Sequence, residues 1–125
     1  SRYYIGWKLS LAHHGPEQVR SRATNASRGP LLLNMKKRLH IYYSGVVQGV
    51  GFRFTAERLG KSLGLAGWVK NLRDGRVEVL CEGEEADLVS FINEMKNGTL
   101  KEYIDSADIE WEEPNGGFTG FQVRF

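Results

Sequence analysis

The chain has 125 residues, of which 41% are hydrophobic and 26% charged, and its formal net charge is +2. This length suits one modest domain, and no apolar run approaches the roughly 20 residues that a membrane-spanning helix needs. Residues 1–34 carry a net charge of +4, which leaves −2 for residues 35–125, so a basic surface for nucleic acid is not expected on the domain.

The first 34 residues lack the pattern of a folded element. Residues 21–30 are polar without a period, and Trp7, Leu9 and Leu11 alternate over too few residues to predict a strand. We expect a disordered or loosely ordered leader over 1–34, either upstream sequence or a tail added for expression, with an organelle transit peptide as the alternative. His13 and His14 have no third ligand at useful spacing, so they do not predict a metal site.

From residue 36 onward, apolar periodicity predicts a series of strands and helices. Strands are expected at 38–43, 65–70, 77–81, 107–111 and 121–125, helices at 52–63 and 84–97, and a turn at 71–75. The single cysteine, Cys81, excludes an internal disulfide and is expected to be a small core residue. The element order predicts an α+β, ferredoxin-like (βαββαβ) two-layer sandwich over 35–125. Its sheet is mainly antiparallel, with two helices on one face and a short fifth strand at the end.

The glycine-rich stretch from Gly45 to Arg53 joins the first strand to the first helix. Arg53 begins that helix, where a cation meets the positive end of the helix dipole and is unfavourable. The free N–H groups of the turn add positive charge at the same point. The sequence therefore predicts an anion site here, most simply for a phosphoryl group.

Three motifs give this pattern a family resemblance. Gly45-x-Val47-Gln48-Gly49-Val50-Gly51-Phe52-Arg53, then Gly64-Leu65-x-Gly67-Trp68-Val69-x-Asn71, then Asp74-Gly75-x-Val77-Glu78 resemble the acylphosphatase family over about residues 37–125. The resemblance implies an enzyme that hydrolyses the carboxyl–phosphate bond of small-molecule acyl phosphates, with inorganic phosphate as a product. It implies no metal and no cofactor. We further expect a cytoplasmic monomer without nucleic-acid or membrane partners.

The resemblance also implies which residues act. The family's catalytic arginine and asparagine match Arg53 and Asn71, and the backbone N–H groups of a six-residue segment would bind the phosphate: Gln48, Gly49, Val50, Gly51, Phe52 and Arg53. Arg53 offers a planar fork of donors for phosphate oxygens. Local sequence alone favours a turn-shaping role for Asn71, whereas the resemblance implies that its carboxamide orients the attacking water. For Gln48, only a backbone contact is expected.

Other functions of a glycine loop fit less well. Phe54 occupies the third glycine position of a dinucleotide fingerprint, and no Lys-Ser/Thr pair follows the last glycine as a Walker loop requires. Gln48–Phe52 echoes an RNA-binding motif, but it lies between strand and helix, and Val50 replaces a stacking aromatic residue. A non-catalytic phosphate-binding or regulatory module stays open, because binding and turnover both use Arg53.

The chain departs from the family pattern at Gly98–Tyr103. Relatives often have a proline-rich bend there, whereas this segment has no proline. Because it is far in sequence from the motifs, we expect an altered loop shape and retained activity.

Overall fold

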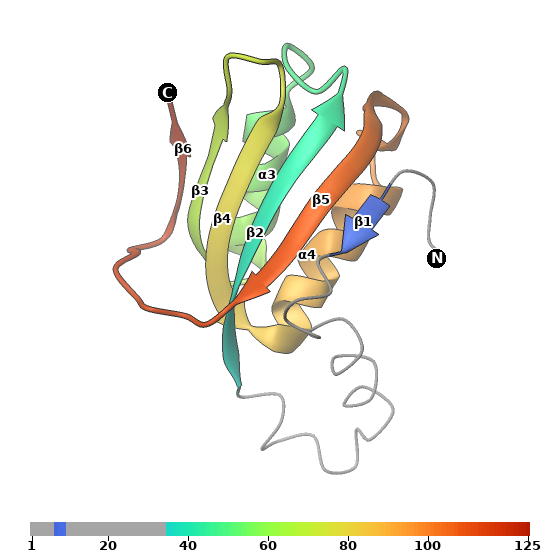
Figure 1. Cartoon of the computed structure of the whole chain (residues 1–125). Helices are drawn as coiled ribbons and strands as arrows, with labels where there is room; N and C mark the ends of the chain where they lie inside the picture. The colour runs from blue at the N-terminus through green and yellow to red at the C-terminus, as the bar shows by residue number, and fades with distance from the viewer. Residues whose placement is uncertain (1–6, 10–34) are drawn as a thin grey trace.

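The computed structural model describes residues 7–9 and 35–125. In chain order the elements are β1 (Trp7–Leu9), β2 (Lys36–Gly45), α3 (Phe52–Ser62), β3 (Ala66–Asn71), β4 (Val77–Glu84), α4 (Glu85–Asn97), the 3₁₀ turn η2 (Lys101–Tyr103), β5 (Ile104–Glu112) and β6 (Phe121–Arg124). One sheet has the order β1-β5-β2-β4-β3-β6, and both helices lie against one of its faces (Figure 1). The expected ferredoxin-like sandwich is confirmed.

The strand directions decide which ends of the strands meet. β2 is antiparallel to β4 and β5, and β3 is antiparallel to β4, so β2 and β3 run the same way on either side of β4. β6 is parallel to β3. The carboxyl ends of β2, β3 and β6 therefore lie at the same end of the sheet, the upper end in Figure 1. The glycine-rich loop follows β2 at this end.

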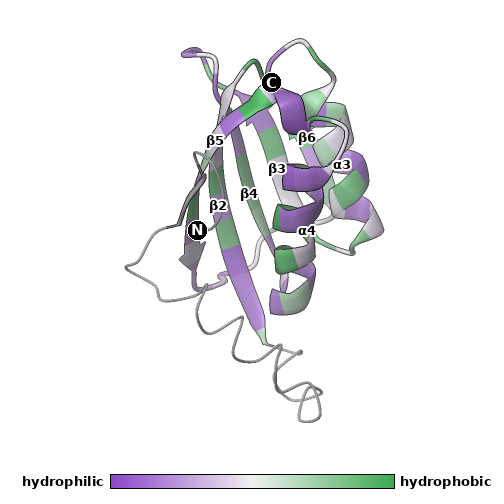
Figure 2. Cartoon of the chain, turned by 90° about the vertical axis from the view of Figure 1, so that its right-hand side faces the viewer, coloured by the Kyte–Doolittle hydropathy of each residue, from purple (hydrophilic) through white to green (hydrophobic). Residues whose placement is uncertain are grey.

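The core lies between the sheet and the helices. Alternate residues of β2 and β4 are fully buried on the helix side, including Ile41 and Val79. Phe52 and Ala56 of α3 and Phe91 of α4 are among the buried helical residues of the same core. Figure 2 shows the two helices on one side of the sheet, with hydrophilic residues on their outer surfaces. Alternation of period two in the strands and about 3.6 in the helices thus produced the two layers.

Most predicted elements are confirmed, with strands extended by a few residues. Two expectations were wrong. Trp7–Leu9 forms a strand, because it pairs in parallel with the edge of β5 at Ala107–Ile109, a partner that local sequence could not reveal. Asn71 was expected in the turn, but it is the last residue of β3 and pairs with Val77.

The structure also bears on the expectations for Cys81 and for a membrane span. Cys81 is fully buried in β4, as expected for a core residue. His13 and His14 lie outside the described residues. Within the part of the chain that the structure describes, no helix is long and apolar enough to cross a membrane.

Candidate active site

The loop after β2 begins at Gly45, where any larger residue would force the neighbouring backbone to shift. Gly45 has φ +131°, and a Cβ there would lie 2.3 Å from the carbonyl oxygen of Tyr103. The β2–β5 register shifts between Ser44 and Gly45. The next N–H group, that of Val46, donates to the same Tyr103 oxygen at 2.9 Å. This close approach ties the start of the loop to η2.

Two further glycines shape the loop by their backbone angles. Gly49 has φ +82° and Gly51 has φ +81°, in the left-handed region that other residues adopt at a cost. A Cβ at either glycine would meet nothing within 4 Å, so the positive φ, and not a protein contact, requires glycine. Gly51 is also the N-cap of α3, where it accepts the first helical bond from Thr55 at 3.0 Å.

The loop and the first turn of α3 present unpaired N–H groups. Among residues 35–125, no hydrogen-bond acceptor is found for the N–H groups of residues 47 to 53. No side chain caps α3, and its first turn contains no acidic residue. The first N–H groups of a helix have no acceptor within the helix, so a run of such donors beside the loop is suited to bind an anion.

Arg53 is half-buried in the first turn of α3. Its guanidinium carbon lies 4.8 Å from the centre of the Phe125 ring. Within the described part of the chain, no carboxylate forms an ion pair with Arg53. The guanidinium edge is therefore available to an anion, and its charge adds to that of the helix start.

Asn71 is the last residue of β3 and lies at the end of the sheet where the glycine-rich loop begins. In the register, Tyr43 of β2, Val77 of β4 and Asn71 form one row across three strands. Asn71 follows Val69 by two residues, so it shares the helix-facing side of the sheet with that buried valine. Its half-buried carboxamide makes no hydrogen bond to any described residue. A donor and an acceptor are thus both available on the side of the sheet that carries Arg53.

The side chain of Gln48 joins the loop to the β3–β4 hairpin. Its Nε2 donates to the carbonyl oxygen of Leu72 at 2.7 Å and to that of Arg76 at 2.9 Å. Leu72 directly follows Asn71, so this bridge holds the end of β3 against the middle of the loop. Sequence reasoning missed it, since Gln48 was expected to contribute only its backbone, and nothing local to Gln48 indicates carbonyl oxygens 24 and 28 residues away.

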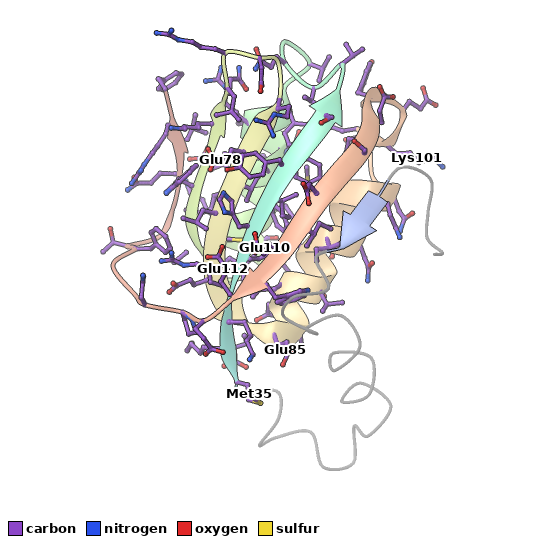
Figure 3. The ribbon with its side chains drawn as sticks, in the orientation of Figure 1. Met35, Glu78, Glu85, Lys101, Glu110 and Glu112 are labelled. Atoms are coloured by element: carbon purple, nitrogen blue, oxygen red, sulfur yellow. The ribbon has the colours of Figure 1, made fainter. Side chains whose placement is uncertain are left out.

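The opposite, open face of the sheet carries several paired charges. His40 Nε2 lies 2.7 Å from Glu78 Oε2, and Arg38 Nε lies 2.8 Å from Glu82 Oε2. Figure 3 shows Glu78, Glu110 and Glu112 along this face. In the described residues, no group of three or more His, Cys, Asp or Glu side chains could hold a metal ion. Burial raises the pKa of the Cys81 thiol, which leaves no thiolate there as a nucleophile.

Comparisons with known proteins place the chain in one family. The family model for acylphosphatases matches residues 39–123. The chain is 38% identical over 86 residues to an acylphosphatase of Roseiflexus sp. (strain RS-1), covering 69% of this chain and 92% of that protein. It is 42% identical over 88 residues to one from Anaeromyxobacter dehalogenans (strain 2CP-C), covering 70% and 95%. The crystal structure of acylphosphatase from Bacillus subtilis matches with a TM-score of 0.67 and 37% identity, covering 73% of this chain and 100% of that one.

Proposed function

The chain belongs to the acylphosphatase family and is an acyl phosphate hydrolase, and from this premise we propose that Arg53 and the loop N–H groups bind the phosphate while Asn71 positions the attacking water. The N–H groups of residues 47 to 53, which have no acceptor among residues 35–125, are the observation that carries the phosphate-binding role.

The phosphate-binding role follows from charge and geometry. The Arg53 fork donates two parallel hydrogen bonds to oxygens on phosphorus, and the loop N–H groups donate to the same group. These donors are fixed before the substrate arrives, since the glycine angles and the Gln48 bridge define the loop. Fixed donors around the phosphoryl oxygens stabilise the charge that spreads over them as the P–O bond breaks.

The role of Asn71 concerns the nucleophile. Its carboxamide oxygen accepts a hydrogen bond from water, which directs a lone pair of that water at phosphorus. The water–phosphorus bond forms, the bond from phosphorus to the bridging oxygen breaks, and the bonding electrons leave on the carboxylate. Acyl phosphate dianion plus water gives carboxylate plus dihydrogen phosphate, which then exchanges a proton with solvent. A carboxylate leaves readily, so the mechanism needs no strong general acid.

The remaining assignments are parts of the same proposal. We place the catalytic domain at 35–125, with residues 1–34 outside it. The enzyme acts as a cytoplasmic monomer without a nucleic-acid partner, and it needs neither a metal nor a cofactor. The negative net charge of residues 35–125 supports the absence of a nucleic-acid partner.

Replacing Arg53 tests the phosphate-binding role. Arg53→Ala should lower kcat/KM for a generic acyl phosphate by about 100-fold or more, because it removes the cation from the site. Inorganic phosphate should compete with substrate in the natural enzyme and only weakly in the variant. The matched control is Arg58→Ala, five residues later on α3, since Arg58 stacks on Phe54 instead of Phe125. Near-normal hydrolysis by Arg53→Ala, or an equal loss in the control, would refute the assigned role.

A further inference from the structure

Arg76 follows the tight turn of the β3–β4 hairpin, and its backbone and side chain are both bonded. Its N–H group donates to Asp74 Oδ1 at 3.1 Å, and its Nε donates to Asp74 Oδ2 at 2.9 Å. Its carbonyl oxygen accepts from Leu72 N–H at 2.8 Å and from Gln48 Nε2 at 2.9 Å. Arg76 therefore connects the turn, through Asp74, to the bridge that reaches the phosphate loop.

The guanidinium of Arg76 lies on the open face of the sheet. Its central carbon is 4.6 Å from the centre of the Tyr42 ring. Tyr42 pairs with Glu78 in the register, and Glu78 lies along this face in Figure 3. Since β4 separates β2 from β3 in the sheet, the contact fastens the end of the β3–β4 hairpin to a strand that does not border β3.

Tyr42 is a firm support for this cation. The centre of the His40 ring lies 4.8 Å from that of Tyr42, and His40 Nε2 lies 2.7 Å from Glu78 Oε2. An aromatic face attracts a cation. Because neighbours on two strands restrain the ring, its contact with the guanidinium restrains the Arg76 side chain.

The position of the hairpin decides where Asn71 stands. Asn71 directly precedes Leu72, whose N–H group bonds to Arg76 and whose carbonyl oxygen accepts from Gln48. The phosphate loop is held in addition by its own glycine angles and by the Tyr103 oxygen. A shift of the hairpin would therefore move Asn71 while the loop keeps its donors. Misplacing a reacting group by about 1 Å costs about 100-fold in rate.

We propose that Arg76 is a positioning residue for the hydrolysis. Its side chain holds the hairpin against Tyr42, and the hairpin holds the Asn71 carboxamide at the place from which it directs the attacking water. Arg76 acts through Asn71 and does not bind the substrate. This inference rests on the proposed role of Asn71.

Steady-state kinetics on benzoyl phosphate, with the full-length chain, test the inference. Arg76→Ala should lower kcat about fivefold, because an exposed ion pair and an exposed cation–π contact are each modest. The inhibition constant of inorganic phosphate should change by less than about twofold, since Arg53 and the loop N–H groups remain.

Arg73→Ala is the matched control. Arg73 is an exposed arginine of the same hairpin, but it forms no hydrogen bond, ion pair or ring contact with any described residue. Its replacement should leave both kcat and the phosphate inhibition constant unchanged. An equal loss of kcat in this control would show that charge near the site, and not the contact with Tyr42, is what matters, and the inference would be wrong.

Further variants separate positioning from a general loss of stability. Tyr42→Leu removes the aromatic face and should lower kcat as Arg76→Ala does, whereas Tyr42→Phe keeps the face and should hold kcat within about twofold. In the Asn71→Ala background, Arg76→Ala should lower kcat further by less than about twofold, because the group that it positions is already gone.

Three results would overturn the inference. The first is a natural kcat in Arg76→Ala. The second is a further loss of about fivefold in the Asn71→Ala background, which would make the two residues independent. The third is phosphate inhibition that weakens as much as kcat falls, because Arg76 would then act on the phosphate loop.

The two proposals fail in different ways. If Asn71→Ala keeps the natural kcat, the water-positioning role itself is wrong. If Asn71→Ala is impaired while Arg76→Ala is not, the role of Asn71 stands and only the inference about Arg76 falls.

Discussion

Arg53 lies at a position that is unfavourable for the stability of α3. A cation in the first turn of a helix opposes the helix dipole by about 0.3–1 kcal/mol. Within residues 35–125 no carboxylate offsets this charge, and only the ring of Phe125 covers part of it. An anion bound at the loop would offset the positive charge of both the helix start and the guanidinium. The unfavourable position is thus evidence for a ligand, and it could be recognised in the sequence.

Asn71 should affect the chemical step more than binding. In Asn71→Ala we expect kcat to fall about 100-fold while KM changes by less than about threefold, because an oriented water matters only in the transition state. Steady-state kinetics on benzoyl phosphate would measure both constants. Asn93→Ala, an exposed position on α4, is the control. A raised KM with unchanged kcat would make Asn71 a substrate-binding residue instead.

At the scale of elements, the site is a junction between the loop and the β3–β4 hairpin. Leu72 N–H donates to the Arg76 oxygen at 2.8 Å, and Gly75 N–H donates to the Leu72 oxygen at 3.2 Å. Each of these two oxygens can accept a second hydrogen bond, and Gln48 Nε2 donates it. The loop and the strand end that carries Asn71 are therefore one hydrogen-bonded unit.

Breaking that junction should disturb catalysis without removing any proposed catalytic group. Gln48→Ala should lower kcat/KM about tenfold and stability by about 1–3 kcal/mol, the value of two half-buried hydrogen bonds. Gln48→Glu should be worse on both counts, because a carboxylate would face two carbonyl oxygens. Kinetics and urea unfolding would measure the effects. If Gln48→Glu matched the natural enzyme, the bridge would be irrelevant to the site.

The segment from Gly98 to Tyr103 shows how elements distant in sequence meet. It is far in sequence from the motifs, but the Tyr103 oxygen accepts a hydrogen bond from Val46 and lies against Gly45. Distance in sequence therefore does not mean distance in space here. The expectation that activity survives this departure stays a prediction.

At the scale of the whole molecule, Glu82 fastens the long connection between β5 and β6. Its carboxylate accepts from Arg38 Nε at 2.8 Å, from Asn115 N–H at 2.9 Å and from Gly116 N–H at 3.1 Å. Burial favours a higher pKa for Glu82, but the hydrogen bonds from Asn115, Arg38 and Gly116 together lower it below its usual value of 4.5. The network thereby ties Asn115 and Gly116 of this connection to β4.

This network predicts a pH-dependent stability. Glu82 has a lower pKa in the folded state than in the unfolded state, so its contribution is complete above about pH 4.5 and is lost as the pH falls through the folded pKa. Glu82→Gln should therefore lower the free energy of unfolding by about 1 kcal/mol at pH 7, and the difference should shrink on acidification. Urea unfolding at several pH values would measure it, with Glu94→Gln as an exposed control. A difference that does not change with pH would contradict the prediction.

Removing residues 1–34 tests the proposed domain boundary. Every residue proposed to act lies in 35–125, so kcat/KM should stay within about twofold of the natural value. The melting temperature should fall, because the shortened chain lacks β1 and leaves the edge of β5 unpaired. Lost activity in a variant with a native circular dichroism spectrum would give the leader a functional role.

The sequence by itself determined the order of the helices and strands within residues 35–125 and the fold class, and it predicted an anion site at the loop. These follow from local patterns: period two in the strands, about 3.6 in the helices, and an arginine beside glycines at a helix start. The motifs also pointed to the acylphosphatase family and its activity, and the comparisons confirm both.

Only the tertiary structure decided what lies beside what. The parallel strand Trp7–Leu9, the Gln48 bridge, the Tyr103 contact and the ring of Phe125 on Arg53 each join segments at least 24 residues apart. Such contacts depend on strand order and register, which no local periodicity encodes, because the same strands could pair in other orders with their apolar faces equally buried.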